Sequence, residues 1–348
     1  MRKYGRKLIL TTVTTLLLFC IGGCAADTTQ TLPDRKEVDQ QIQIGMTFDS
    51  FIIERWQRDR DAFVAKATKE LGAEVNIQNA NGDTTEQAKQ IDYFIEKNMD
   101  VIVVVPIDSD AVTDAIKRAK KAGIRVIAYD RLVKNANVDL YITFDNEKVG
   151  ALMAQSVKQN IPDNGNILMM CGPLEDNNVE LVQKGFMREL ETSEITVKAT
   201  GHATGWVAED GFDFVSSYLN KDTKIDAVMC GNDGIAAQVI HALSERRLAG
   251  DVCVVGQDAD LDACQRIVEG TQTMTVYKPV EKLAQKAAEY AVKLATGESM
   301  QVTNTFFDGS GEVPYVGLEP IAVTKDNMDL IINDGYHLEE EIYLNINK

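Results

Sequence analysis

The stretch VIVVVPIDSDAVTDAIKRAKKAGIRVIAYDR, residues 101–131, decides the fold. It opens on an apolar run at 101–106, continues through an amphipathic segment at 111–121 that stops before Gly123, and closes on a second apolar run at 126–129. Runs this short and uniformly apolar are typical of strands that are buried on both faces of a sheet. A strand–helix–strand order of this length indicates a parallel βαβ unit.

The same alternation extends in both directions along the chain. Further apolar runs lie at 42–48, 74–78, 166–171, 196–200, 226–230, 252–256 and 273–277. Helical patterns separate them at 55–71, 84–98, 184–190, 207–219, 234–243, 261–268 and 280–294. The alternation of apolar runs and helical patterns is interrupted by a connection at 140–146 and resumes after it. The sequence therefore predicts an α/β protein with two similar, Rossmann-like doubly wound lobes in series.

The N-terminus has the features of an export signal. Four basic residues precede an apolar stretch of 14 residues at 8–21, which is too short to span a bilayer comfortably. The stretch ends in Ile21-Gly22-Gly23-Cys24, which resembles a bacterial lipobox. We expect residues 1–23 to be a signal peptide, Cys24 to carry a lipid, and residues 24–40 to be a tether at the outer side of the cell membrane. A plain secretory signal with a chance cysteine is the alternative.

Composition excludes several classes of function. Lys and Arg number 36 against 53 Asp and Glu, so the formal charge is −17. This charge argues against binding to nucleic acid and against lying on an anionic lipid surface, so we expect contact with the membrane itself through the lipid anchor only. With three His and no CxxC spacing, we expect no metal and no cofactor. Four cysteines, Cys171, Cys230, Cys253 and Cys264, lie in apolar segments, where free buried thiols are expected and a disulfide stays open.

Polar side chains gather where the predicted strands end. In open α/β sheets, ligands bind beyond the carboxyl ends of the strands. The residues that follow the runs are Asp49, Asn79, Asn81, Asp108, Asp130 and Arg131 in the first half and 175–178, 204–206, 232–233, 257–258 and Lys278 in the second. If the two lobes face each other, these edges form one polar cleft.

The chemistry of these residues suits an uncharged sugar. Planar Asp, Asn and Arg groups bond neighbouring hydroxyls in pairs, and aromatic rings cover the apolar faces of a sugar ring. Anion sites favour glycine-rich turns, and neither GxGxxG nor GxxxxGK[ST] is present. Asp258 and Asp260 could be a glycosidase pair, but one ligand contact and one helix cap is the commoner use of this spacing. We therefore expect a binding protein and not an enzyme.

Long segments of the chain carry a family resemblance. They are GMTFDSFIIERWQRDR (45–60), QNANGDTTEQ (78–87), AYDRLV (128–133), TFDNEKVG (143–150), GNDG (231–234), VVGQDADLDACQRIVEGTQTMTVYKP (254–279) and INDGYHLEEE (332–341). In this order they resemble the bacterial periplasmic sugar-binding proteins of the ribose/galactose type, and most closely the xylose-binding branch. The resemblance runs from about residue 42 to about residue 338.

The resemblance implies the type I periplasmic binding protein fold, in which two lobes are joined by a three-segment hinge. We expect the crossovers near 144–146, 277–279 and 303–307. The first lobe would comprise 41–144 and 278–304, and the second 145–277 and 305–338.

The resemblance also implies the site. The expected ligand-binding residues are Arg55, Trp56, Asp130, Arg131, Asn177, Trp206, Asn232, Asp258 and Lys278. Several have structural alternatives. Asn177 could cap a helix while Asn178 meets the ligand, Asn232 could be a turn residue, Asp258 could be an N-cap, and Trp56 could belong to the core. Asn79 and Asn81 suit a tight turn, and a departure from the family's paired acids at Asp49 weakens its assignment.

The function implied is reversible binding of a monosaccharide, D-xylose foremost, between the lobes of a monomer, and its delivery to the permease of an ABC importer. The alternative is a sugar receptor that reports to a membrane histidine kinase. A transcription regulator with this fold would need a DNA-binding helix-turn-helix, whose place the export signal occupies.

Overall fold

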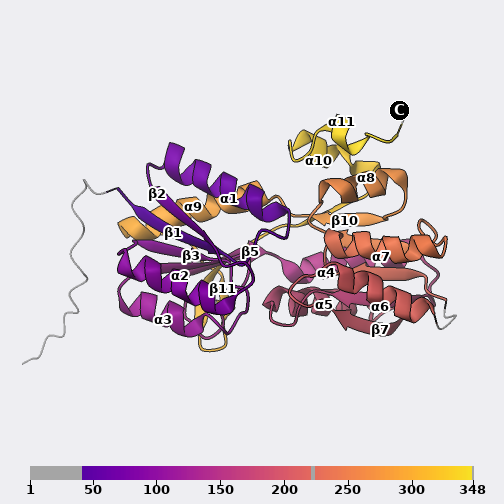
Figure 1. Cartoon of the computed structure of the whole chain (residues 1–348), viewed down its shortest axis with the longest axis horizontal. Helices are drawn as coiled ribbons and strands as arrows, with labels where there is room; N and C mark the ends of the chain where they lie inside the picture. Colours follow the sequence, from indigo (N-terminus) through magenta and orange to yellow (C-terminus); the bar gives the residue numbers. More distant parts are fainter. Residues whose placement is uncertain (1–40, 221–223, 347–348) are drawn as a thin grey trace, which may run out of the picture. The chain divides into compact units, whose positions relative to one another are not determined.

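A computed structural model describes residues 41–220 and 224–346 of the chain (Figure 1). The expected signal peptide, the lipid site Cys24 and the tether at 24–40 lie outside the described residues. Among the described residues, no helix combines the length and the apolar character that crossing a membrane requires.

Five of the seven strands of the first sheet come from residues 43–144. Its strands, in spatial order, are β11 (Thr305–Phe307), β12 (Glu312–Leu318), β5 (Leu140–Phe144), β4 (Arg125–Tyr129), β3 (Val101–Val104), β1 (Gln43–Phe48) and β2 (Glu74–Asn79). All neighbours pair in parallel except β11 with β12. The central strands β3 and β4 are buried on both faces, apart from Arg125 at the start of β4, as their apolar runs predicted.

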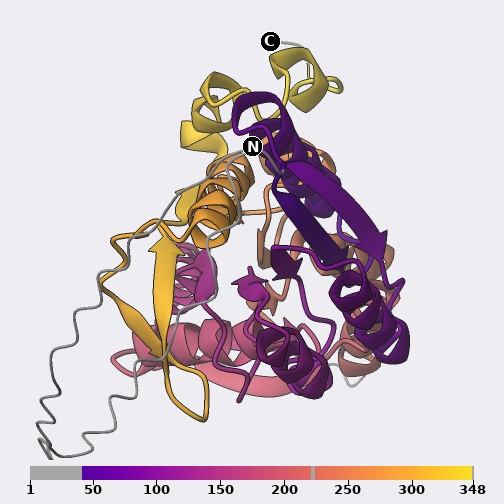
Figure 2. The same cartoon turned by 90° about the vertical axis from the view of Figure 1, so that its left-hand side faces the viewer.

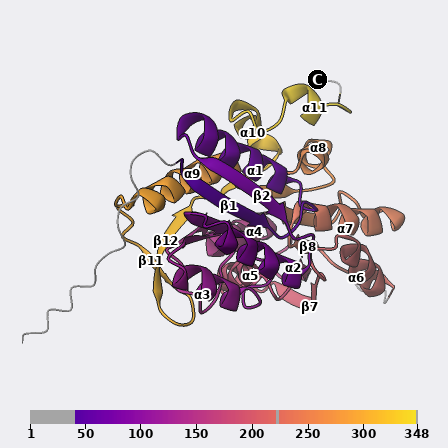
Figure 3. The same cartoon turned by 60° about the vertical axis from the view of Figure 1, so that its left-hand side comes forward.

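Helices cover both faces of this sheet. Alternate residues of β3 point to opposite faces, so Val101 and Val103 join one core cluster and Ile102 and Val104 another. On one side lie α1 (Arg55–Ala65), its continuation η1 (Lys66–Glu70) and α9 (Val280–Thr296), and on the other α2 (Thr84–Glu96) and α3 (Thr113–Lys121) (Figure 3). We call these elements the first lobe.

The second sheet repeats the plan. Its order is β13 (Ile321–Val323), β10 (Met274–Tyr277), β9 (Cys253–Gln257), β8 (Ala227–Cys230), β6 (Asn166–Cys171) and β7 (Thr196–His202), all parallel except β13. Its helices are α4 (Asn146–Asn160), α5 (Asn177–Leu190), α6 (Glu209–Leu219), α7 (Asp233–Glu245) and α8 (Leu261–Glu269). A C-terminal segment adds η2 (Lys325–Asn327), α10 (Asp329–Asn333) and α11 (Glu339–Ile342), the last beside α8. Together these form the second lobe.

The chain passes between the sheets three times, and the third passage differs from the expectation. Asp145 links β5 to α4, and Lys278 and Pro279 link β10 to α9, close to the expected positions. The third passage lies at Glu319 and Pro320 instead of 303–307. Residues 305–318, expected in the second lobe, extend the first sheet because β12 pairs with β5, Tyr315 opposite Tyr141. Figure 2 shows this two-stranded ribbon in orange.

The four cysteines of the described chain are free and buried. Burial raises the pKa of Cys171 to about 12 and that of Cys253 to about 11, so both thiols stay protonated at neutral pH. No group of three or more His, Cys, Asp or Glu side chains within the described ranges is arranged to hold a metal ion.

Candidate functional site

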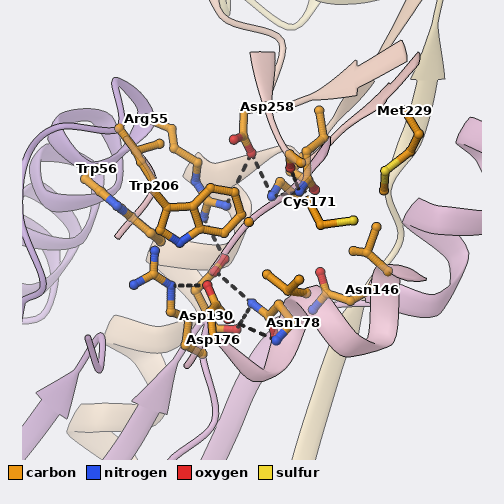
Figure 4. A pocket seen from close by; sticks show the side chains of 18 residues that line it. Arg55, Trp56, Asp130, Asn146, Cys171, Asp176, Asn178, Trp206, Met229 and Asp258 are labelled. Atoms are coloured by element: carbon orange, nitrogen blue, oxygen red, sulfur yellow. Dashed lines mark hydrogen bonds and ion pairs between the residues drawn. The ribbon is translucent and has the colours of Figure 1, made fainter. Parts of the chain in front are cut away.

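A cavity lies where the carboxyl ends of both sheets meet (Figure 4). Its lining comes from both lobes: Ile53, Arg55, Trp56, Asp130, Arg131, Asn146, Cys171, Gly172, Asp176, Asn178, Val179, Val182, Trp206, Met229, Gly231, Gln257, Asp258 and Lys278. The enclosed volume is about 30 Å³, which suffices for one or two water molecules.

The structure brings most of the expected site residues to this cavity. Those that line it are Arg55, Trp56, Asp130, Arg131, Trp206, Asp258 and Lys278. Asn177 and Asn232 do not line it. The placement follows from the topology, because parallel strands deliver the residues after their carboxyl ends to one edge.

Arg55 and Asp130 form the first-lobe part of the site. Arg55 is the first residue of α1, and its guanidinium pairs with Asp59 at 3.1 Å and with Asp130 at 2.8 Å. Burial favours the neutral form of Asp130, but Arg55, Lys278 and Arg131 outweigh it and hold its pKa below the ordinary value. Asp130 therefore stays ionised and can accept hydrogen bonds from a ligand.

Arg131 connects the two lobes. Its Nη1 lies 2.7 Å from Asp49 and 3.1 Å from the carbonyl oxygen of Pro106, both in the first lobe. Its Nε lies 2.7 Å from Asp176, just before α5 in the second lobe. The guanidinium is thus fixed on three sides in the cavity wall. Asp49 was not included among the expected ligand-binding residues. It pairs with Arg131 but does not itself line the cavity.

Asp258 and Lys278 form the matching group in the second lobe. Lys278 Nζ lies 2.7 Å from Asp258 and 3.0 Å from Gln257 Oε1. Arg55 Nη1 lies 3.9 Å from the same Asp258 oxygen, so this carboxylate faces cations from both sides of the cavity. Asp258 is not the helix cap that the alternative interpretation proposed, since Asp260 occupies that position before α8.

Two tryptophans flank Arg131. Its guanidinium carbon lies 5.4 Å from the ring centroid of Trp56 and 5.9 Å from that of Trp206. Both indole N–H groups are buried and have no hydrogen-bond partner. Buried donors without partners are costly. Trp56 also packs into the first-lobe core, as the alternative interpretation held.

Asn178, and not Asn177, reaches the cavity. Its Nδ2 donates to the backbone oxygen of Asp130 at 3.0 Å and to its carboxylate at 3.3 Å. Both residues begin α5, and one residue along a helix turns the side chain by about 100°, so they face different directions. Asn177 instead contacts Ser109 through its backbone N–H.

Asn232 caps a helix. Its side-chain oxygen accepts from the backbone N–H of Ile235 at 2.8 Å, which satisfies the N-terminus of α7. The side chain is thereby turned from the cavity wall, and its neighbour Gly231 lines the cavity in its place. Gln257 Nε2 donates to the carbonyl oxygen of Gly231 at 2.6 Å.

Sequence reasoning missed several lining residues. Asn146 follows 140–144, which we interpreted as a connection but which forms strand β5, so its place at a strand end was not recognised. Asp176 and Gln257 are among the strand-end residues identified from the sequence, but they were not included in the expected ligand-binding set. The apolar lining residues Cys171, Val182 and Met229 carry no signal that separates them from ordinary core residues.

Further contacts hold the two lobes together around the cavity. The hydroxyl and the backbone N–H of Ser109 in the first lobe both donate to the carbonyl of Glu175 in the second, at 2.9 and 3.1 Å. With the Arg131–Asp176 and Asp130–Asn178 contacts, they place the structure in a closed arrangement of the lobes.

Comparison with known proteins agrees with this geometry. Residues 44–299 match the family model described as periplasmic binding protein domain. The chain is 44% identical over 310 residues to the D-xylose-binding periplasmic protein of Haemophilus influenzae, covering 87% of this chain and 93% of that protein. It is 40% identical over 343 residues to the D-xylose-binding periplasmic protein of Escherichia coli, covering 97% and 99%.

Solved structures share the fold. An ABC transporter solute binding protein from Clostridium phytofermentans with bound β-D-glucose superposes with a TM-score of 0.77 at 28% identity, covering 86% of this chain and 99% of that one. A carbohydrate transporter solute binding protein from Chloroflexus aurantiacus in complex with D-glucose gives a TM-score of 0.79 at 28% identity, covering 87% and 98%. The expected type I fold with two α/β lobes is therefore confirmed. The chain belongs to the periplasmic binding protein family, whose members are ligand-binding receptors and not enzymes.

Proposed function

We propose that this protein binds one uncharged monosaccharide, D-xylose, in the cavity between its lobes. The observation that carries the proposal is the balance of charge in the wall. Among the lining residues, three cations, Arg55, Arg131 and Lys278, form ion pairs with three carboxylates, Asp130, Asp176 and Asp258. Asp49 and Asp59, which do not line the cavity, pair with the same two arginines from behind. A charged ligand would upset this balance, whereas hydroxyl groups can both donate to the carboxylates and accept from the cations.

The aromatic side chains support a sugar over other neutral ligands. A pyranose offers apolar C–H faces, which indole rings cover, and ring and hydroxyl oxygens, which unpartnered indole N–H groups can bond. Trp56 and Trp206 supply both features from opposite lobes. The choice of D-xylose rests on the two relatives at 44% and 40% identity, whose names give that sugar.

We propose that binding works by closure. A ligand shifts a conformational equilibrium only through contacts that are better in one state. Here the groups that would bind the sugar are divided between the lobes, with Asp130 and Arg131 on one side and Asn178 and Asp258 on the other. A sugar held by one lobe would therefore gain the second set of bonds on closure.

The expected membrane partners complete the proposal. We infer that Cys24 carries a lipid that anchors the protein outside the cell membrane, and that the closed form delivers sugar to an ABC permease. Substituting Cys24→Ser should move the protein from the membrane fraction to the soluble one. Crosslinking in sugar-fed cells then separates a permease from a membrane histidine kinase as the partner.

A melting-temperature screen against pentoses and hexoses tests the sugar proposal. A ligand that binds the native state raises the melting temperature by mass action. At a concentration of 100 times its Kd, it adds about 2.7 kcal/mol to the free energy of unfolding. D-xylose should give the largest shift, and titration calorimetry should return one site per chain. Absence of any shift with all of the sugars would refute the proposal.

A further inference from the structure

A turn that carries a proposed sugar ligand has an unusual backbone. Asp258 and Ala259 adopt φ values of 102° and 57°, a region that non-glycine residues rarely occupy. Such strain persists only where surrounding groups hold it. Part of this support lies within the second lobe, where Asp258 N–H donates to Val276 O at 2.9 Å and Ala259 N–H donates to Thr275 at 3.1 Å.

The carbonyl groups of the same turn are held by the C-terminal segment. His337 Nε2 lies 2.8 Å from the carbonyl oxygen of Ala259, and the hydroxyl of Tyr336 lies 3.4 Å from that of Asp258. Cys264 adds a weaker sulfur contact to Ala259 at 3.7 Å. Tyr336 and His337 are themselves buried, so these bonds form away from water. Neither residue lines the cavity.

The segment is in turn anchored near the second crossover. Asp334 accepts from the hydroxyl of Tyr277 at 2.6 Å and pairs with Lys282 at 3.2 Å. Tyr277 ends β10 directly before the crossover residue Lys278, and Lys282 lies in the first turn of α9. The segment therefore links the turn at Asp258 to the hinge.

Tyr336 also contacts the first lobe. The guanidinium of Arg58 lies 4.2 Å from the centre of its ring, a cation–π distance. Arg58 stands one turn of α1 after Arg55, which reaches Asp258 from the cavity side at 3.9 Å. Helix α1 therefore contacts the Asp258 turn in two ways. Arg55 contacts Asp258 itself, and Arg58 contacts Tyr336, which bonds to the backbone of the turn.

From these contacts we propose that the C-terminal segment 334–337 is a positioning element for the sugar site. Tyr336 and His337 hold Asp258 in its strained, ligand-facing conformation, and the Arg58–Tyr336 contact couples this hold to closure of the lobes. The inference rests on the proposed function in one respect, since it assigns Asp258 to the sugar.

The test compares His337→Leu, which removes the donor to Ala259, with His337→Gln, which keeps a side-chain N–H donor. Loss of one buried hydrogen bond should weaken D-xylose affinity about tenfold in His337→Leu, with faster release, whereas His337→Gln should stay within about threefold. Arg58→Gln should weaken affinity about threefold through the lost cation–π contact. Val313→Ala, in the first-lobe core far from the turn, is the control that lowers the melting temperature without changing affinity.

A second readout does not depend on sugar. Hydrogen exchange of the amides of residues 258–260 in the sugar-free full chain should accelerate in His337→Leu and not in Val313→Ala. Unchanged exchange in His337→Leu would overturn the proposal. If the wild type binds xylose, faster exchange in His337→Leu together with unchanged xylose affinity in that variant would overturn it as well. If the wild type binds no sugar, the proposed function fails, and the exchange data alone decide whether the segment holds the turn.

Discussion

Individual residues at the site are strained as well as charged. Asp130 and Trp206, from opposite lobes, have φ values of 62° and 66°, and Asp258 has 102°. Positive φ costs a non-glycine residue of order 1–3 kcal/mol. Three lining positions therefore carry backbone strain, and such strain persists only where surrounding groups hold it.

Removing Arg131 should abolish sugar binding. The substitution Arg131→Ala leaves Asp49 and Asp176 without their cation and removes a guanidinium group that lines the cavity. Each bond to a charged group contributes about 1.5–3 kcal/mol, so D-xylose affinity should fall about a hundredfold or more in titration calorimetry. The far-ultraviolet circular dichroism should stay unchanged. Arg118→Ala, which breaks an exposed pair with Asp92, is the matched control; near-wild-type affinity in Arg131→Ala would show that the site is misplaced.

Gly172 should be required for the placement of Trp206. A Cβ added at Gly172 would lie 2.4 Å from the indole ring, so Gly172→Ala must push the ring out of position. We expect at least a tenfold loss of xylose affinity and a changed tryptophan emission spectrum. Gly311→Ala, where an added Cβ meets nothing within 4 Å, should alter neither. Equal affinity in both variants would contradict a role for Trp206 in binding.

The sequence could predict those site residues whose position follows from a strand end. Asp130, Arg131 and Asp258 come directly after apolar runs, and parallel pairing sends them to one edge. The direction of a side chain after that edge depends on local backbone, which no periodicity reports. For this reason the sequence did not decide between Asn177 and Asn178, of which Asn178 lines the cavity, and did not show that Asn232 caps α7.

At the level of elements, the closest helix packing supports the cavity wall. Helices α4 and α5 approach so closely that a Cβ at Gly185 would lie 1.8 Å from the carbonyl oxygen of Glu147, and one at Gly150 would lie 1.9 Å from that of Val182. Asn146 at the start of α4 and Asn178 at the start of α5 line the cavity. The two glycines therefore set the spacing of helices that carry site residues.

Substituting Gly185→Ala should force these helices apart. Overpacking against backbone costs about 1–3 kcal/mol, and we expect a loss of this size in the free energy of unfolding, measured by urea denaturation. Gly234→Ala in α7, where an added Cβ makes ordinary contacts at 3.6 Å, should stay within about 1 kcal/mol of the wild type. Unfolding free energies that do not separate the two variants would argue against this account of the α4–α5 contact.

Most elements were predictable because strands and helices here have strong patterns, and the exceptions have a physical cause. The run 140–144 is short and precedes a polar segment, so it was interpreted as a connection. Residues 305–318 contain the glycine-rich turn DGSG and Pro314, which interrupt any strand signal. Their place in the first sheet is decided by pairing with β5, a tertiary contact between segments about 170 residues apart.

On the scale of the whole molecule, stability should depend on a buried carboxyl group behind the site. Asp233, fully buried, accepts from Gln272 at 2.8 Å and from Thr275 at 2.7 Å. Burial raises its pKa to about 7, with nearby Asp258 adding to the rise, while the Thr275 bond and Arg266 lower it in part. Burial and Asp233 also raise the pKa of Asp260.

The sign of the effect follows from proton binding. Between the unfolded pKa of about 3.9 and the folded value of about 7, the native state holds a proton on Asp233 that the unfolded chain releases. The stability that this group contributes is therefore complete at low pH and is lost as pH rises through about 7.

Asp233→Asn, which stays uncharged, removes this contribution to the pH dependence. Its free energy of unfolding relative to the wild type should rise from pH 5 to about pH 7 and level off by pH 8, in urea denaturation at fixed salt. Asp163→Asn on an exposed loop should show no such trend. Parallel pH profiles for Asp233→Asn and the wild type would mean that Asp233 is ionised in the folded protein throughout this range.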